Sequence, residues 1–281
     1  MSKHADVKTL EQGDIFFFYR PKVSSQEIKS IDDVRRFYMV LCPEDEQKII
    51  DNTNNDTNTN AKKKKIYRLL IIGKKSLPEI RRTEARSSER FWAQVGGIFY
   101  DSKKLGEDLT SEEFRKGDVA RPVGEGKYAI IEHQNHTELA FILEMPQEIG
   151  EAQKELGIQK EATYIITVIN PNKPVPEGYS TAQAERPKYP EDIEKYLNNI
   201  QDKFISLSQN LNLINYQNAQ VVLIGAREGK DIIKQEIGLD IETEDEGGDK
   251  ENISSSADIF TKLKIRKEQV PIKPIIEGKF Q

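Results

Sequence analysis

Apolar residues along this chain gather in short blocks that polar stretches separate. The blocks are DIFFFYRP, RFYMVLCP, YRLLIIG, YAIIEH, LAFILEMP, TYIITVI and QVVLIGA. Short blocks rich in β-branched and aromatic residues are typical of strands. With the apolar stretch FWAQV they predict strands over residues 15–20, 36–42, 66–73, 91–95, 127–133, 138–145, 162–169 and 220–224. Strands that follow one another directly favour antiparallel pairing. The pattern therefore predicts an α+β fold, with mostly antiparallel strands in one or two β-rich halves and short peripheral helices.

The polar stretches between the blocks carry helix and turn signals. We expect short helical segments within 30–35, 79–90, 101–116, 146–156, 191–200 and 231–237. Four residues, QNHT, separate two apolar blocks at 134–137 and predict a hairpin. Gly96-Gly97 is interpreted as the end of a strand, and the GEG sequence at 124–126 as a tight turn before the next one.

Composition divides the chain into unequal parts. Residues 1–9 form a polar tail, and residues 10–238 form a compact domain, either undivided or built from halves 10–120 and 121–238. An Asn/Thr/Lys-rich insertion lies near 50–64, an acidic linker covers 239–257, and a C-terminal tail covers 258–281. Segments 50–62 and 240–256 lack the apolar residues that offset the entropy of ordering, so we expect both to be disordered.

Length and composition limit the class of protein. The chain has 281 residues, of which 36% are hydrophobic and 32% charged, and one cysteine, Cys42, within an apolar run. A single cysteine forms neither an intramolecular disulfide nor a cysteine-based zinc site, so a buried, inert thiol is expected. The N-terminus lacks the apolar core of a signal peptide, and no apolar run approaches the length of a membrane helix. We therefore expect a soluble, cytoplasmic protein that does not enter a membrane.

Charge is distributed in two opposite blocks. Residues 62–90 hold eleven Lys and Arg against three Glu, a local charge of +8, whereas residues 240–251 carry −6. The whole chain carries −5. A basic block attracts polyanions, so nucleic acid or another polyanion is the expected partner.

Several motifs together resemble a known family. The segments LEQGDIFFFYRP, RLLIIGKKSLPE, ERFW, ARPVGEGKYAI, HTELAFILE, VINP and VVLIGA are similar to an uncharacterised prokaryotic family found in bacteria and archaea. This resemblance spans roughly residues 10–226 and implies no particular activity. In addition, the opening GDIFFFYRP followed by RRFYMVL resembles the start of SH3-like barrel endoribonuclease toxins and of PUA- or EVE-like modules. That resemblance implies a small barrel that binds RNA or DNA.

The basic block supplies the candidate nucleic-acid contacts. Phosphate contacts are assigned to its cations and base stacking to an aromatic ring, because single-stranded nucleic acid is bound by cationic grooves with stacking faces. The assigned residues are Lys74, Lys75, Arg81, Arg82, Arg86, Arg90 and Trp92, with Tyr67 and Phe91 as further stacking faces. The alternative interpretation is a solvated helix face beside a buried Trp92.

Two histidines, His133 and His136, are the candidate metal ligands. If the hairpin turn is Gln134-Asn135, the two imidazoles face each other across the strands. Neighbouring Glu132 and Glu138 are expected to point to the opposite face, which leaves two ligands where zinc usually has three or four. The sequence thus predicts no tightly bound metal and no cofactor. The segment GAREGKD at 225–231 has the wrong spacing for a phosphate-binding loop and is interpreted as an ordinary turn.

Three hypotheses on function follow, and an enzyme is not the favoured one. The first is a non-enzymatic binding module that binds nucleic acid through the basic strip at 62–90. The second is a metal-assisted hydrolase or nuclease that uses His133 and His136. The third is a protein-interaction factor that acts through the C-terminal tail.

Overall fold

The computed structural model describes residues 7–23, 27–49, 62–80, 90–113, 116–133, 136–174, 185–229, 233–234 and 257–281. Its strands are β1 (Val7–Pro21), β2 (Val34–Pro43), β3 (Gln47–Ile49), β4 (Lys62–Lys64), β5 (Tyr67–Ile72), β6 (Arg90–Phe99), β7 (Arg121–His133), β8 (His136–Met145), β9 (Glu161–Ile169), β10 (Phe204–Ser206) and β11 (Gln220–Glu228). Its α-helices are α1 (Ser102–Thr110), α2 (Glu151–Glu155), α3 (Glu191–Asn199), α5 (Asp258–Lys262) and α6 (Lys273–Ile276). Short 3₁₀ helices are η1 (Ile31–Asp33), η2 (Leu211–Asn215) and η5 (Lys267–Gln269).

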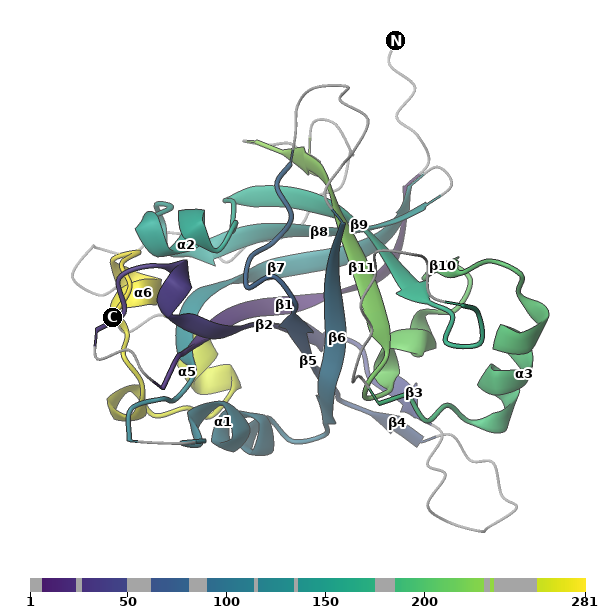
Figure 1. Ribbon diagram of the computed structural model, residues 1–281, viewed down its shortest axis with the longest axis horizontal. Coiled ribbons are helices and arrows are strands. Elements are labelled where there is room, and N and C mark those ends of the chain that lie inside the picture. Colours follow the sequence, from purple (N-terminus) through teal and green to yellow (C-terminus); the bar gives the residue numbers. More distant parts are fainter. Residues whose placement is uncertain are drawn as a thin grey trace.

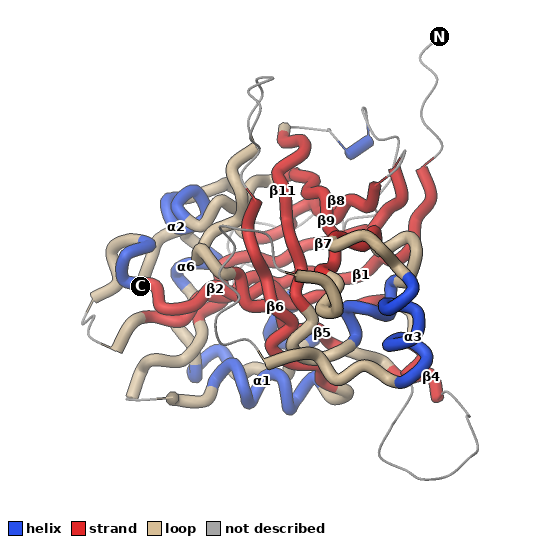
Figure 2. The backbone as a smooth tube through the Cα atoms, turned by 45° about the vertical axis from the view of Figure 1, so that its right-hand side comes forward, coloured by secondary structure: helices blue, strands red, loops and turns tan. Residues whose placement is uncertain are grey.

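Eight of the strands close into an antiparallel barrel. The hydrogen-bonded order is β9-β11-β6-β5-β2-β1-β7-β8, and β8 pairs again with β9. Short β10 extends the sheet beside β9, while β3 and β4 form a separate two-stranded ribbon. The strands occupy the centre of the molecule and the helices lie at its periphery (Figures 1 and 2). The predicted β-rich, antiparallel architecture with short helices is confirmed, and its specific form is one closed barrel.

The barrel combines strands from both halves of the chain. Strands β1, β2, β5 and β6 follow one another around one side, and β7, β8, β9 and β11 around the other. The two sets meet at the β1–β7 and β6–β11 pairs, both antiparallel. Because each half supplies part of one continuous sheet, the halves 10–120 and 121–238 are not separate β-rich units.

The alternation of side chains along the strands produces two apolar layers. The barrel interior holds one continuous cluster, which includes Phe17, Phe37, Phe141 and Tyr164. Alternate residues of β1 and β2, such as Phe16, point outward into a second cluster. This outer layer requires a cover, which the helices provide.

Helix α1 covers part of the outer layer as the chain crosses from β6 to β7. Its Leu105 and Leu109 are buried against the outward residues of β1 and β2. Arg20 of β1 fixes the end of the helix, because its guanidinium donates to the carbonyls of Asp108 and Leu109 at 3.3 and 3.4 Å. A cation at this end offsets the negative end of the helix dipole.

Residues 257–281, expected as a tail, also pack against the barrel. Ile259, Leu263 and Ile275 are fully buried in the outer cluster. The Glu125 carboxylate of β7 accepts hydrogen bonds from the backbone N–H groups of Asp258 and Ile259, at 3.0 and 2.8 Å. In Figure 1 this segment (yellow) lies beside α2 and the β7 side of the barrel. The C-terminal segment therefore completes the fold rather than extending from it.

Three glycine segments for which the sequence predicts turns lie inside strands. Gly96 is the extra residue of a bulge in β6, since Leu69 pairs with Gly97 and Leu70 with Val95. The GEG sequence at 124–126 belongs to β7, where a Cβ at Gly126 would overlap the carbonyl of Ile142 on β8. The GARE part of GAREGKD continues β11 through a second irregularity. In these strands glycine permits bulges and close backbone contacts, a role that local patterns do not distinguish from a turn.

Other expected segments agree only in part. Residues 7–9 are the first residues of β1, so the polar tail is shorter than predicted. Residue ranges 50–61, 81–89 and 235–256 lie outside the described residues. Most of the Asn/Thr/Lys-rich insertion, most of the segment 79–90 for which a helix is expected, and nearly all of the acidic linker fall in these ranges. Within the part of the chain that is described, no helix has the length and apolarity that crossing a membrane requires.

Candidate functional sites

A cluster of polar side chains lies on the outer wall of the barrel at the β7–β8 hairpin. His133 ends β7 and pairs directly with His136, which begins β8. Glu138 follows two residues later on the same face, since the alternating residues Leu139 and Phe141 belong to the barrel interior. Arg227 comes from β11, where it pairs with Thr163 of β9 and reaches across that strand. We call His133, His136, Glu138 and Arg227 the histidine cluster.

Glu138 is the centre of the histidine cluster. Its Oε1 lies 3.0 Å from His133 Nδ1 and 2.8 Å from His136 Nε2. Arg227 Nη1 donates to both carboxylate oxygens at 2.8 Å, and its Nη2 lies 3.4 Å from His133 Nδ1. The two imidazole rings stand edge to face with their centroids 5.7 Å apart. Two imidazoles and a guanidinium thus converge on one carboxylate.

The histidine cluster is buried on one side and open on the other. The Glu138 side chain is 0% exposed and that of His133 6%, whereas His136 is 31% exposed and Arg227 27%. Burial alone would raise the pKa of Glu138. Hydrogen bonds from both imidazoles and the charge of Arg227 outweigh it, so the pKa is lowered from its ordinary value. A lowered pKa keeps this buried carboxylate ionised and able to bind cations.

The position of Glu138 differs from the one that the sequence predicts. The hairpin brings His133 and His136 together as expected. Glu138, however, is two residues from His136 and therefore shares its face, because side chains alternate with a period of two. Glu132 pairs with Thr137, whose hydroxyl bonds to the carbonyl of Ile166 on β9 at 3.1 Å, and so lies on the other face. Among the described residues, Glu138 is therefore a carboxylate neighbour of both histidines, where the sequence predicts none.

The basic block at 62–90 does not form one surface. Lys62, Lys63 and Lys64 lie on β4, at the entry to β5, while Lys74 and Lys75 follow its far end. Arg68, between them, points into the barrel and is 0% exposed. Arg81, Arg82 and Arg86 lie outside the described residues. The structure thus divides the described cations of the block into two surface groups and one interior residue.

The second surface group gathers around the single tryptophan. Arg90 and Trp92 share the outward face of β6, being two residues apart on one strand. The turn that carries Lys74 and Lys75 is held beside them, because the N–H of Gly73 donates to the carbonyl of Trp92 at 2.7 Å. Lys74 and Arg90 are exposed, and Lys75 and Trp92 are half-buried. We call these four residues the β5–β6 cationic surface.

The aromatic residues that the sequence predicts as stacking faces have different surroundings. The Lys74 ammonium lies 4.4 Å from the centroid of the Phe91 ring, which is buried, so this ring already holds a cation. Tyr67 is half-buried against the outer apolar cluster. Trp92, the third candidate, is half-buried on the outward face of β6 beside Arg90.

No family model, curated protein or solved structure matches this chain. The resemblance to a prokaryotic family and that to SH3-like or PUA-like barrels therefore stay predictions.

The barrel interior contains a buried ion pair that the strand pattern did not predict. Arg68 Nη2 donates to Glu11 Oε2 at 2.8 Å, and Arg68 Nε donates to Asn215 Oδ1 at 2.7 Å. The Tyr128 hydroxyl donates to Glu11 Oε1 at 2.7 Å. Burial alone would lower the pKa of Arg68, but the charge and hydrogen bonds of Glu11 outweigh it and raise that pKa. This network is buried, with the Arg68 side chain 0% and the Glu11 side chain 2% exposed.

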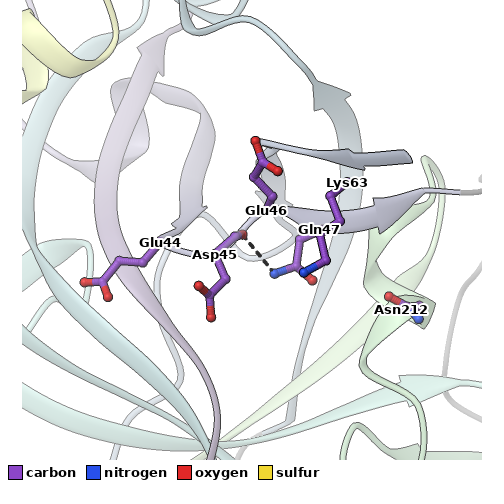
Figure 3. A pocket seen from close by; sticks show the side chains of 6 residues that line it. All are labelled: Glu44, Asp45, Glu46, Gln47, Lys63 and Asn212. Atoms are coloured by element: carbon purple, nitrogen blue, oxygen red, sulfur yellow. Dashed lines mark hydrogen bonds between the residues drawn. The ribbon is translucent and has the colours of Figure 1, made fainter. Parts of the chain in front are cut away.

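An open hollow of about 640 Å³ lies near the β3–β4 ribbon. It is lined by Glu44, Asp45, Glu46, Gln47, Lys63 and Asn212. Its three carboxylates point in different directions, and Gln47 bonds to the Asp45 carbonyl at 3.2 Å (Figure 3). Because these carboxylates do not converge, the hollow is not a site for a single cation.

Cys42 shows the expected environment of an inert thiol. It is buried in the outer apolar cluster and forms no disulfide. Burial raises the pKa of its thiol far above the ordinary value, so the reactive thiolate does not form near neutral pH.

Proposed function

We propose that this protein is a binding module for single-stranded nucleic acid, which it binds through the β5–β6 cationic surface. The observation that carries the proposal is the position of Trp92. It lies half-buried on an outward strand face, with Arg90 two residues away and the Lys74–Lys75 turn attached to its backbone. A stacking ring flanked by cations is how proteins bind single strands without reading their sequence.

The neighbouring strand supports the proposal in a second way. Arg90, Trp92 and Gln94 of β6 pair with Ile224, Val222 and Gln220 of β11. These β11 residues are uncharged, so they add no negative charge to repel phosphates. Exposed Glu79, whose backbone lies against Gly225 of β11, is one acidic residue near this face. The overall charge of −5 argues for a modest, salt-sensitive affinity, because long-range attraction to the whole molecule is absent.

The test uses the intrinsic fluorescence of the protein. The chain has one tryptophan, Trp92, so fluorescence quenching on addition of an oligonucleotide reports directly on this surface. We expect quenching by a single-stranded homopolymer such as oligo(dT), weakened as salt rises. The triple variant Lys74→Gln/Lys75→Gln/Arg90→Gln should reduce the slope of log K against log salt. The expected reduction is roughly 0.7 for each phosphate that the protein no longer neutralises, about 2 in total.

A matched control separates this surface from general electrostatics. Lys63, Lys103 and Lys104 are exposed lysines on β4 and α1. Changing all three to Gln removes the same charge at a different place and should leave the slope nearly unchanged. Equal reductions in both triple variants, or no quenching of the wild type at low salt, would refute the proposal.

A further inference from the structure

We propose that His133, His136 and Glu138 form a binding site for a divalent transition-metal ion of the zinc class. One ligand atom from each residue lies within 4.8 Å of the others. Two imidazoles and a carboxylate are a ligand set that zinc uses in proteins. The site lies on β7 and β8, whereas the β5–β6 cationic surface lies on other strands, so this inference is independent of the proposed function.

The spacing of the ligand atoms is close to what one ion requires. Zinc binds imidazole nitrogen and carboxylate oxygen at about 2.0–2.2 Å, so two ligand atoms of one ion lie at most about 4.4 Å apart. In a tetrahedral site two ligand atoms lie about 3.4 Å apart. Glu138 Oε1, at 3.0 and 2.8 Å from the imidazole nitrogens, must therefore separate from them slightly, and any pair of ligand atoms as far apart as 4.8 Å must approach. His136 can make this movement, because it lies beside the hairpin turn and is 31% exposed, while Glu138 is fixed in the wall at 0% exposure.

Arg227 already neutralises Glu138 and therefore affects metal binding. Its Nη1 contacts both carboxylate oxygens at 2.8 Å. A carboxylate offers about four lone-pair sites, so Oε1, to which both imidazoles point, can bind an ion while Oε2 keeps its bond to Arg227. Such outer hydrogen bonds commonly orient metal ligands. The guanidinium charge nevertheless repels a divalent ion, so Arg227 sets a limit on metal affinity.

The open side of the cluster leaves room for a further ligand. Three protein ligands leave a fourth position for water or an anion, which is the arrangement of catalytic rather than structural zinc sites. Arg227, 27% exposed, contacts the Glu138 carboxylate that would bind the ion. An anionic group bound to the ion would therefore also meet a guanidinium. A metal at this position is what the hydrolase hypothesis requires.

The experiment measures zinc binding to the full-length protein purified without an affinity tag and stripped with a chelator. We expect one zinc ion per chain with a dissociation constant of about 1 µM or lower, that is, about −8 kcal/mol or stronger. His133→Ala, His136→Ala and Glu138→Gln should each weaken binding about 100-fold or more. Cobalt(II) in place of zinc should give the visible absorption of a four-coordinate ion.

Two controls and one gain-of-affinity variant make the result decisive. Glu132→Gln changes a neighbouring carboxylate on the other face, and His4→Ala removes the third histidine of the chain, so both should bind as the wild type does. Arg227→Met should increase zinc affinity roughly tenfold or more, because it removes the competing cation. This variant decides the question even if a ligand variant fails to fold.

The proposal is overturned by any of three results. These are wild-type binding weaker than about 100 µM, equal binding by the ligand variants and the wild type, or unchanged affinity in Arg227→Met. In each case the histidine cluster is a hydrogen-bonded charge network only.

Discussion

Two Glu–Arg pairs of the described barrel, Glu11–Arg68 and Glu138–Arg227, each have a buried carboxylate, but they differ in how exposed the guanidinium is. Arg68 and Glu11 lie inside the barrel, with side chains 0% and 2% exposed. Glu138 and Arg227 lie on the outer wall, where the guanidinium is 27% exposed. Tyr128 and Asn215 complete the inner pair, whereas two imidazoles complete the outer one. The phenol and the amide of the inner pair form hydrogen bonds only, while imidazoles are also metal ligands.

Burial of the carboxylate alone therefore does not distinguish the two pairs. A charge pair enclosed on every side has its hydrogen bonds satisfied and serves the fold. A pair with one partly exposed partner can exchange that partner for water or an ion, and the exchange costs less free energy than in a fully buried pair.

The largest effect should follow Arg68→Met, which leaves the Glu11 carboxylate buried in the barrel beside the Tyr128 hydroxyl. Breaking a buried pair on one side costs about 3–5 kcal/mol of unfolding free energy. Urea denaturation measures this loss. The double variant Arg68→Met/Glu11→Leu removes both charges and should recover much of it. A single-variant loss below about 1 kcal/mol would mean that water reaches the pair.

Glu125 provides a third case for this comparison. Its buried carboxylate accepts hydrogen bonds from backbone N–H groups rather than from a guanidinium. Burial raises its pKa from 4.5 to about 7, partly opposed by the N–H donors of Ile259 and Asp258. A raised pKa means that the folded state binds the proton more tightly, so this stabilisation is complete below pH 4.5 and is lost as pH rises through 7. Between pH 5 and 8 the loss amounts to about 2–3 kcal/mol.

The measurement compares the wild type with Glu125→Gln, which cannot titrate. The wild type should lose about 2–3 kcal/mol relative to this variant when the pH is raised from about 5 to about 8, as followed by urea denaturation. Parallel pH profiles would show that Glu125 is charged at both pH values.

A smaller effect is expected for Glu138→Gln in the absence of metal. The variant leaves Arg227 without its carboxylate, but this guanidinium is partly exposed and gains water in exchange. We expect a loss of about 2 kcal/mol in unfolding free energy, less than for Arg68→Met. A loss as large as that of the inner pair would remove the distinction between the two.

The smallest effect belongs to an ion pair on the surface. Lys103 and Glu107 of α1 lie 3.7 Å apart, with side chains 70% and 64% exposed. Exposed pairs of this kind contribute little because both partners are well solvated. Glu107→Gln should leave the melting temperature unchanged within error, and a clear decrease would require a role for Glu107 beyond this pair.

The sequence predicts the strands of this fold but not their arrangement. Alternating and apolar runs are local signals, so they locate the core of each barrel strand. Closure depends on the β6–β11, β1–β7 and β8–β9 pairings, which join residues far apart in the chain or across a helix. Glycine at 96, 124 and 126 suggests breaks where the strands in fact continue, since a bulge and a turn share the same residue type.

The candidate sites show the same limit. The pairing of His133 with His136 follows from the length of the turn and is predictable. Arg227 is not, because Gly225 suggests that the strand ends there. Arg68 does carry a local signal, since it lies two residues before Leu70 and thus in the inward phase of an apolar strand. Charge counts over a segment cannot distinguish such a residue from its exposed neighbours.

The position of β11 has a consequence for the order in which this protein folds. This strand lies between β6 and β9, and it is the last strand of the barrel along the chain. Until residues 220–228 are available, β6 and β9 present unpaired edges that can join other chains. Closure also joins distant segments, which makes folding slow. A nascent chain that stops before residue 220 should therefore be the form most prone to aggregate.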